Sequence, residues 1–174
     1  MPQETDRIKL ERINYSFLDA FHIYSLQDSI YTHLEFSPFK SLTDSKNYLE
    51  KLNSRISTGK ADYRFLILKE SKVLVGLFGF HSYDEERKSI EFGYGVSPKH
   101  QRKGLFTEVA QHIIFNLYKN TNIHRIYALT SVNNVASIKG LHKVGFKKEG
   151  VLKDYYFKNG EFFDAQISGM VRLK

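Results

Sequence analysis

Hydrophobic and polar residues follow two different periods along this chain, which predicts both strands and helices. Residues 89–96, SIEFGYGV, repeat every two positions: the even positions from Ile90 to Val96 are apolar or aromatic, whereas Glu91 and two glycines face the other way. Two glycines on one face of a strand indicate either a bulge or a backbone that another group approaches closely. This stretch is therefore expected to be a strand with an unusual environment.

The helical period is clearest just after this strand. In residues 105–119, LFTEVAQHIIFNLYK, apolar positions recur every three or four residues and form one stripe, made by Phe106, Val109, Ala110, Ile113, Ile114 and Leu117. Similar patterns predict further helices at 17–30, 42–56 and 133–145, and strands at 8–13, 63–70, 72–83, 89–96, 123–131 and on both sides of Asn159-Gly160 within 151–173.

Two local motifs support these boundaries. Ser41 and Asp44 have the spacing of a capping box at the start of the helix 42–56. Asn159-Gly160 is the dipeptide preferred in a two-residue type I′ hairpin turn.

The predicted order of elements is β-α-α-β-β-β-α-β-α-β-β. Helices between strands indicate an α/β fold with crossover connections, and the last two strands indicate an antiparallel hairpin. The chain has 174 residues, without repeats or low-complexity segments, which is the size of one domain. We therefore expect a single domain over residues 1–174, built on a mixed sheet.

The segment QRKGLFT, residues 101–107, connects the strand 89–96 to the helix 105–119. The first amides of a helix have no partners within the helix and lie at the positive end of its dipole, so they favour an anion. Gly104 allows a close approach of the backbone, and Arg102 and Lys103 add positive charge. Taken alone, the segment is either an anion site or a basic turn capped by glycine.

Composition limits the chemistry further. The net charge of +7 favours an anionic partner such as a nucleic acid, a phosphorylated cofactor or an acidic surface, although the cations are dispersed. The absence of cysteine excludes a thiol nucleophile, and the seven histidines lack the spacing of metal ligands, so no metal is expected. We find neither a Walker A loop nor a dinucleotide fingerprint. Neither a membrane span nor a secretory leader is visible, and the absence of cysteine fits a reducing compartment, so we expect a cytoplasmic location.

Several short motifs, in a fixed order, resemble the GNAT superfamily of N-acetyltransferases. The strand EFGYGVSP leads into the loop QRKG, which is followed by Asn134-Val135-Ala136-Ser137 and then by Lys143-Val144-Gly145-Phe146. The chain closes with an N-G-x-x-x-D pattern that ends at Asp164. The branch that it most resembles is the RimJ/RimL type, which acetylates N-termini of ribosomal proteins, together with the spermidine acetyltransferases.

This resemblance implies a binding site for acetyl-CoA. The loop would hold the pyrophosphate, the backbone of Val96 would pair with the pantetheine arm, and Asn134 would contact the cofactor from the next helix; the loop residues are Gln101, Arg102, Lys103, Gly104, Leu105, Phe106 and Thr107. The arm would insert between splayed strands, for which the bulge suggested by Gly93 and Gly95 is suited. Phe106 replaces the usual glycine or alanine and fits only if it points into the core.

The resemblance also suggests catalytic residues. Glu91 is the candidate base, but could equally be a carboxylate that neutralises a nearby cation. Leu141 occupies the position where many members of the family have the tyrosine that protonates the leaving thiolate, which leaves Ser137 as the candidate acid. Alternatively, Ser137 is only a residue near the start of the helix whose hydroxyl bonds to the backbone. Tyr94 is a third candidate or a core residue, and Asn134 is a cofactor contact or a plain N-cap.

The acceptor implied by the resemblance is a primary amine, on a protein N-terminus or a small molecule such as a polyamine. It would lie among aromatic residues of the first two helices and the closing hairpin: Tyr24, Tyr31, Phe36, Phe39, Tyr155, Tyr156, Phe162 and Phe163. The same aromatics could form the core or a homodimer contact. The positive charge fits a protein N-terminus near the RNA-rich ribosome better than a polyamine, unless acids such as Glu35 and Asp154 gather locally.

Two other functions remain compatible with the sequence. A non-catalytic acyl-CoA-binding module is suggested by Leu141 in the tyrosine position, and a nucleic-acid binder is suggested by charge alone.

Overall fold

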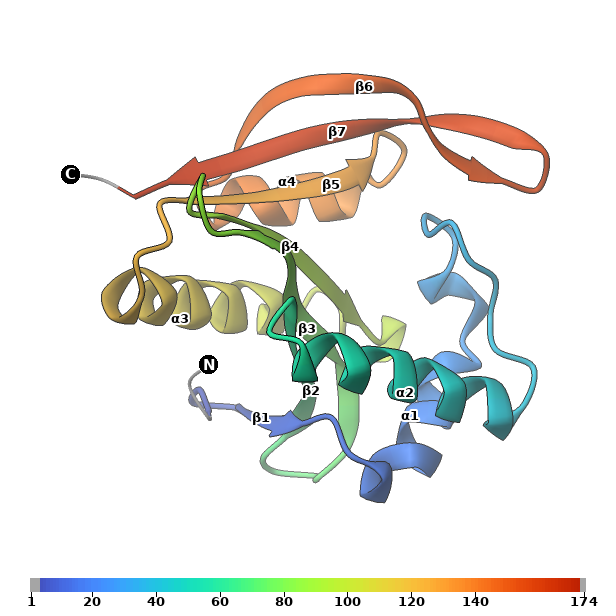
Figure 1. Ribbon diagram of the computed structural model, residues 1–174. Helices are drawn as coiled ribbons and strands as arrows, with labels where there is room; N and C mark the ends of the chain where they lie inside the picture. Colours follow the sequence, from blue (N-terminus) through green and yellow to red (C-terminus); the bar gives the residue numbers. More distant parts are fainter. Residues whose placement is uncertain (1–3, 173–174) are drawn as a thin grey trace.

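The computed structural model describes residues 4–172, which form one seven-stranded sheet flanked by helices (Figure 1). The strands are β1 (Ile8–Arg12), β2 (Ala61–Leu68), β3 (Leu74–Asp84), β4 (Ser89–Val96), β5 (Arg125–Ser131), β6 (Lys147–Lys158) and β7 (Glu161–Val171). The α-helices are α1 (Leu18–Ser25), α2 (Leu42–Ser57), α3 (Leu105–Asn120) and α4 (Val135–Lys143). The predicted element order and the α/β class are confirmed.

The strand order across the sheet is β1-β2-β3-β4-β5-β7-β6. All neighbouring strands are antiparallel except β4 and β5, which run parallel and are connected by α3. Among the described residues, no helix is long and apolar enough to cross a membrane.

Most predicted boundaries agree with the structure. The Ser41–Asp44 capping box is formed in both directions, and both Asn159 and Gly160 have the positive φ that a type I′ turn requires. Strand β6, however, begins at Lys147, four residues before the predicted start, because residues 147–150 pair with β7.

The first predicted helix, 17–30, was too long. Helix α1 ends at Ser25, and Gln27 is extended, with φ −81° and ψ 100°. The side chain of Gln27 donates to the carbonyl of Tyr24 and accepts a hydrogen bond from Ser97, just after β4. A polar side chain thus satisfies the end of the helix and connects it to the sheet, which the local period could not reveal.

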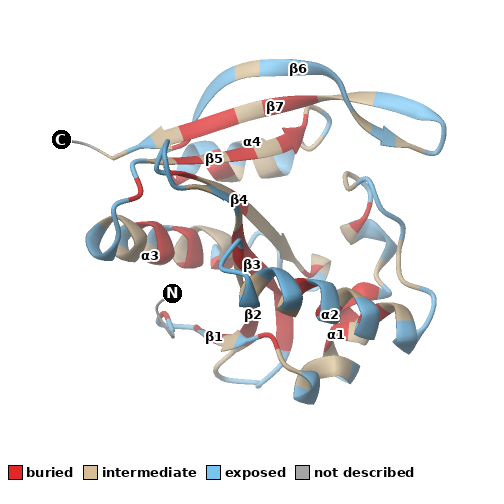
Figure 2. Cartoon of the chain, in the orientation of Figure 1, coloured by how far each residue is buried: buried red, intermediate tan, exposed pale blue. Residues whose placement is uncertain are grey.

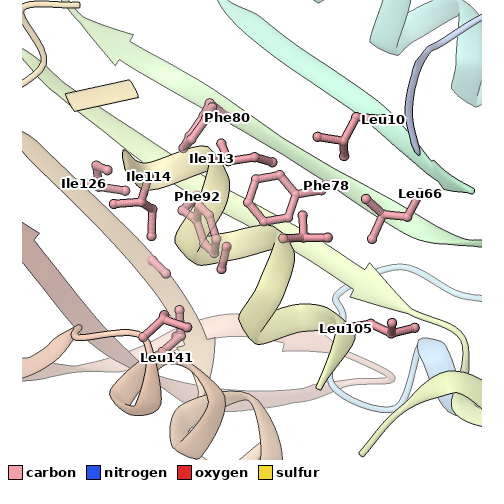
Figure 3. Close-up of a cluster of buried hydrophobic side chains, with 14 of the residues drawn as sticks. Leu10, Leu66, Phe78, Phe80, Phe92, Leu105, Ile113, Ile114, Ile126 and Leu141 are labelled. Atoms are coloured by element: carbon pink, nitrogen blue, oxygen red, sulfur yellow. The ribbon is translucent and has the colours of Figure 1, made fainter. Parts of the chain in front are cut away.

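Each face of the sheet carries its own core (Figure 2). Helices α3 and α4 cover one face, where Phe78 and Phe92 pack with their ring centroids 4.5 Å apart (Figure 3). Helices α1 and α2 cover the other face around Phe21 and Phe65. Because both faces are covered, β3 is buried without interruption from Leu74 to Phe80.

Strands β4 and β5 separate after a short paired segment. Their pairing covers only residues 89–91 with residues 125–127, and Figure 1 shows β5 diverging from β4 beyond this point. The register of β4 with β3 is unbroken from Glu91 to Val96, so the predicted bulge at Gly93 and Gly95 is wrong. The splayed strands arise instead from the short β4–β5 pairing.

The two glycines of β4 allow close approach, the other expectation from the sequence. A Cβ atom at Gly95 would lie 2.5 Å from the hydroxyl oxygen of Tyr24, and a Cβ atom at Gly93 would lie 3.3 Å from Nε2 of His81. Side chains from α1 and β3 therefore cover this face of β4 at van der Waals distance.

Candidate active site

The basic loop before α3 has a backbone suited to an anion. Arg102 has φ +60° and Gly104 has φ +78°, both in the left-handed region. Gly104 is also the N-cap of α3, and no side chain caps the first amides there. A helix N-terminus with uncapped amides, beside the exposed Arg102 and Lys103, forms a positive surface.

A second segment of the chain fixes this loop in place. Arg7 donates from Nη1 to the carbonyl of Lys103 at 2.9 Å and from Nε to Glu108 at 2.6 Å. Glu108, in the first turn of α3, also accepts hydrogen bonds from the backbone of Arg7 and the hydroxyl of Thr5. The segment just before β1 therefore holds the loop at Lys103 and the first turn of α3 at Glu108.

A cavity of about 690 Å³ begins at this loop and reaches the opposite face of the sheet. Its walls include residues packed on the α3–α4 face and residues packed on the α1–α2 face. Since β4 and β5 separate at residue 92, the cavity passes through the sheet where the two strands diverge. A long, narrow ligand could enter from the loop and place its end on the other side.

Most of the residues predicted to hold the cofactor line this cavity: Val96, Gln101, Arg102, Gly104, Leu105, Phe106, Thr107 and Asn134. Lys103 does not line it, although its carbonyl is held by Arg7. The carbonyl of Val96 accepts a 2.9 Å hydrogen bond from the side chain of Gln101. A ligand that bonds to this carbonyl would therefore share it with Gln101 or displace the side-chain amide of Gln101.

Phe106 packs inward, as the apolar stripe predicted. Its ring lies 4.2 Å from the ring of Tyr94, centroid to centroid, and against the core of the α3–α4 face. Gly140 on α4 leaves room for it, because a Cβ atom there would lie 3.1 Å from the Phe106 ring. Phe106 thus forms part of the cavity wall. Gly104, and not residue 106, is the position where the loop backbone can approach an anion closely.

Tyr94 and Ser137 meet inside the cavity. The Tyr94 hydroxyl lies 2.5 Å from Oγ of Ser137 and also bonds the Ser137 carbonyl at 3.3 Å. Burial raises the pKa of Tyr94 to about 12, so the phenol keeps its proton at neutral pH. Asn134 is the N-cap of α4 and accepts from the amide of Ser137 at 3.1 Å. Leu141 is completely buried in the core.

Glu91 does not line the cavity, but it contacts a histidine that does. Nδ1 of His81, directly opposite on β3, lies 3.4 Å from Oε2 of Glu91 and 3.1 Å from Oγ of Ser82. Burial raises the pKa of Glu91, and burial together with the charge of Arg55 lowers the pKa of His81 to about 4. His81 is therefore neutral at pH 7.

The contacts of His81 favour the tautomer protonated at Nδ1, because that nitrogen faces two oxygen atoms. Its Nε2 then carries a lone pair and lies over Gly93, in the cavity wall. Nothing in the local sequence distinguishes this histidine from the other six. The register of the neighbouring strands, which places residue 81 opposite residue 91, is the signal that identifies it.

Comparison with known proteins identifies the fold and its family. The acetyltransferase (GNAT) domain family matches residues 7–147, most of the chain. The chain belongs to the GNAT acetyltransferase family. This GNAT protein is an N-acetyltransferase that uses acetyl-CoA, and the loop, the splayed strands and the through-going cavity fit that cosubstrate. The family resemblance noted in the sequence is confirmed.

Its relatives include enzymes with different acceptors. It is 27% identical to spermidine N(1)-acetyltransferase of Vibrio cholerae, over 78% of this chain and 79% of the relative. It is 29% identical to [ribosomal protein uS5]-alanine N-acetyltransferase of Escherichia coli, over 70% and 63%. The crystal structure of the microcin C7 self-immunity acetyltransferase MccE, in complex with acetyl-CoA and AMP, superposes with a TM-score of 0.91, 22% identity and coverage of 99% and 98%.

Within residues 4–172, no group of three or more histidine, aspartate or glutamate side chains has the arrangement of a metal site. Direct acetyl transfer between a thioester and an amine requires no such site.

Proposed function

We propose that this GNAT enzyme transfers the acetyl group of acetyl-CoA directly to a primary amine that enters the cavity from the α1–α2 side. The supporting observation is the cavity itself, which joins the basic loop on one face of the sheet to the aromatic cluster on the other. Donor and acceptor can therefore approach from opposite ends and meet beside β4, with no need for a covalent enzyme intermediate.

In this proposal, Arg102, Gly104 and the first amides of α3 hold the pyrophosphate, Asn134 orders the start of α4, and the splayed part of β4 accepts the pantetheine arm. Lys103 contributes its charge and, through its carbonyl, the attachment to Arg7. Phe106 and Leu105 supply the apolar part of the cavity wall beside the loop. Val96 and Gln101, which are joined by a hydrogen bond, line the same cavity.

Two groups of side chains are placed for proton transfer. Ser137 and Tyr94 form a hydroxyl pair that donates a proton to the departing thiolate. On the other face of β4, Glu91 holds His81 so that Nε2 accepts the proton released by the amine. Glu91 thus acts through His81, as a positioning residue, in place of direct contact with the amine.

The acceptor belongs either to a protein N-terminus or to a small molecule. Ribosome association is part of the first possibility, and the net charge of +7 favours it over a polycation. A single domain over residues 1–174 and a cytoplasmic location complete the proposal; a homodimer would have to leave both cavity openings free.

A thiol-release assay tests the proposal. Purified protein and acetyl-CoA are incubated with peptides, amino acid amides, polyamines and aminoglycosides, and free CoA is measured. Amine-dependent release, together with acetylated product in the mass spectrum, supports the proposal. Tight binding of acetyl-CoA without release for any amine would favour the non-catalytic acyl-CoA-binding module. RNA binding unaffected by CoA would favour the nucleic-acid binder.

A further inference from the structure

The acceptor end of the cavity combines many aromatic rings with a lining that contains no carboxylate. We propose that the acceptor is a monoamine attached to an aromatic or bulky apolar group, such as the amine of a peptide or amino acid amide with a large apolar first side chain. This inference rests on the proposed acetyl transfer and names its substrate class; it also implies that polyamines are poor acceptors.

The rings come mainly from α1, α2 and the segment between them. Seven aromatic residues line this half of the cavity: Phe21, Tyr24, Tyr31, Phe36, Phe39, Tyr48 and Tyr63. Phe39 and Tyr48 lie with their centroids 5.2 Å apart, and the rings of Phe36 and Phe39 are stacked at 18°. Phe36 remains 43% exposed although it is part of this cluster, so one large apolar face is available to a ligand.

No aspartate or glutamate is among the residues that line the cavity, all of which belong to the described part of the chain. Three acids come near without lining the cavity: Glu91 contacts His81, Glu35 lies in the chain between the lining residues Leu34 and Phe36, and Asp154 belongs to β6. Burial raises the pKa of Tyr31 to about 12 and also raises the pKa of Tyr48, so the phenols are uncharged at neutral pH.

The lysine and arginine side chains of the lining are positive and have no carboxylate beside them in the lining, and one further lysine reaches the acceptor end. Arg102 and Lys143 line the cavity on the cofactor side, and Lys158 of the β6–β7 hairpin donates to the carbonyl of Tyr31 at the acceptor end. A polyamine would bring two or more extra ammonium groups into a space without a carboxylate. Burying an unpaired ammonium is strongly unfavourable, whereas each contact with an aromatic face recovers only about 0.5–2 kcal/mol.

A monoamine avoids this cost, since its single amine is the group that reacts and becomes a neutral amide. Its apolar body gains from contact with the rings: burying one large side chain contributes about 1.5–3 kcal/mol. The cavity therefore discriminates twice, by favouring the apolar body and by rejecting additional cations.

The test compares kcat/KM for phenylalaninamide, alaninamide and spermidine in the thiol-release assay. We expect phenylalaninamide to exceed both of the others by at least about 10-fold, the usual effect of a filled apolar pocket. Phe36→Ala should reduce the preference for phenylalaninamide over alaninamide several-fold, with the KM for acetyl-CoA unchanged. Phe115→Ala is the matched control, because Phe115 is 64% exposed on α3 and does not line the cavity. The inference would be overturned if Phe36→Ala kept the wild-type preference for phenylalaninamide over alaninamide. A higher kcat/KM for spermidine than for phenylalaninamide would also overturn it.

A binding experiment separates this inference from the proposed activity. N-acetylphenylalaninamide and N1-acetylspermidine are titrated into the CoA-loaded protein by calorimetry. Stronger binding of the aromatic amide, without turnover of any amine, would refute the acetyl transfer and support the acceptor class. Turnover of an amine together with stronger binding of N1-acetylspermidine would support the acetyl transfer and refute the acceptor class. Binding of neither compound would overturn the acceptor class.

Discussion

The hydroxyl of Tyr94 on β4 and the Oγ of Ser137 on α4 lie 2.5 Å apart, although the two residues are separated by 43 positions in the chain. Two other side chains stabilise this contact. Asn134 accepts from the amide of Ser137, and Phe106 packs on the ring of Tyr94 in the space left by Gly140. The result is a hydroxyl pair inside the cavity, held on one side by a helix cap and on the other by ring packing.

If Ser137 donates the proton, Ser137→Ala should lower kcat by about 100-fold, the lower end of the range for general acid catalysis. The KM for acetyl-CoA should change by less than about twofold, because Ser137 contributes no charge to the loop. Steady-state thiol release over a range of acetyl-CoA concentrations provides both parameters. Turnover at the wild-type level would show that Ser137 is not the acid.

Tyr94→Phe distinguishes the two hydroxyls, since it keeps the ring packing and removes only the oxygen. If the pair acts as a unit, the double variant should be no slower than the worse single variant. A loss of kcat in Tyr94→Phe, together with wild-type kcat in Ser137→Ala, would assign the proton to the phenol.

Arg102→Glu should raise the KM for acetyl-CoA by about 10-fold or more at low salt, with a smaller ratio to wild type at high salt. Reversing an exposed charge beside the pyrophosphate adds a repulsion that is screened by salt. The measurement is KM at two ionic strengths. Lys51→Glu on the exposed surface of α2 is the control with the same charge change. Identical KM values for Arg102→Glu and Lys51→Glu would place the pyrophosphate elsewhere.

Arg7→Lys tests whether the loop must be clamped. The substitution keeps the positive charge but loses the fork that contacts both Lys103 and Glu108. We expect the KM for acetyl-CoA to rise about three- to tenfold and the Tm to fall by a few degrees, with kcat nearly unchanged. A KM equal to that of wild type would show that the loop keeps its shape without Arg7.

Features governed by neighbouring residues were predictable from the sequence. The helix α3, its apolar stripe, the capping box at Ser41 and the Asn159-Gly160 turn all depend on residues within a few positions of one another. The backbone shape of the basic loop belongs to this group too, because Gly104 and the helix start are adjacent in the chain. Local spacing determines these features, and the structure reproduces them.

Features that depend on pairing between distant segments were missed. Helix α1 ends early because Gln27 bonds to Ser97, 70 residues away. The splaying of β4 depends on where β5 stops pairing, and the glycines predicted a bulge in its place. His81 became a candidate only when the register placed it opposite Glu91, because nothing near it in the sequence separates it from the other six histidines.

His81→Gln should lower kcat/KM for the amine by about 10-fold or more if Nε2 accepts the amine proton, a modest effect for a general base because burial lowers the pKa of His81 to about 4. In wild type, activity should also fall as the pH decreases towards the raised pKa of Glu91, since protonated Glu91 cannot hold His81 in the required tautomer. His124→Gln is the control with the same substitution, because His124 is exposed and does not line the cavity. Unchanged activity in His81→Gln would exclude this residue as the base.

Glu108 should make the stability of the protein depend on pH in the acidic range. Although burial acts to raise its pKa, the hydrogen bonds from Thr5 and Arg7 outweigh burial and lower it below the ordinary 4.5. A carboxylate with a lowered pKa stabilises the folded state fully above its unfolded pKa, and this contribution disappears as the pH falls through the folded pKa. Because Arg7 is half exposed, we expect about 1 kcal/mol.

Glu108→Gln removes this contribution, so wild type and variant should differ in free energy of unfolding at pH 7 and converge near pH 3. Urea denaturation at both pH values measures the difference. Glu50→Gln provides the comparison, since Glu50 lies 4.0 Å from Lys46 in an exposed ion pair that should contribute little at any pH. A difference between wild type and Glu108→Gln that stays constant from pH 7 to pH 3 would show that the lost contacts, and not the charge, stabilise the clamp around the loop.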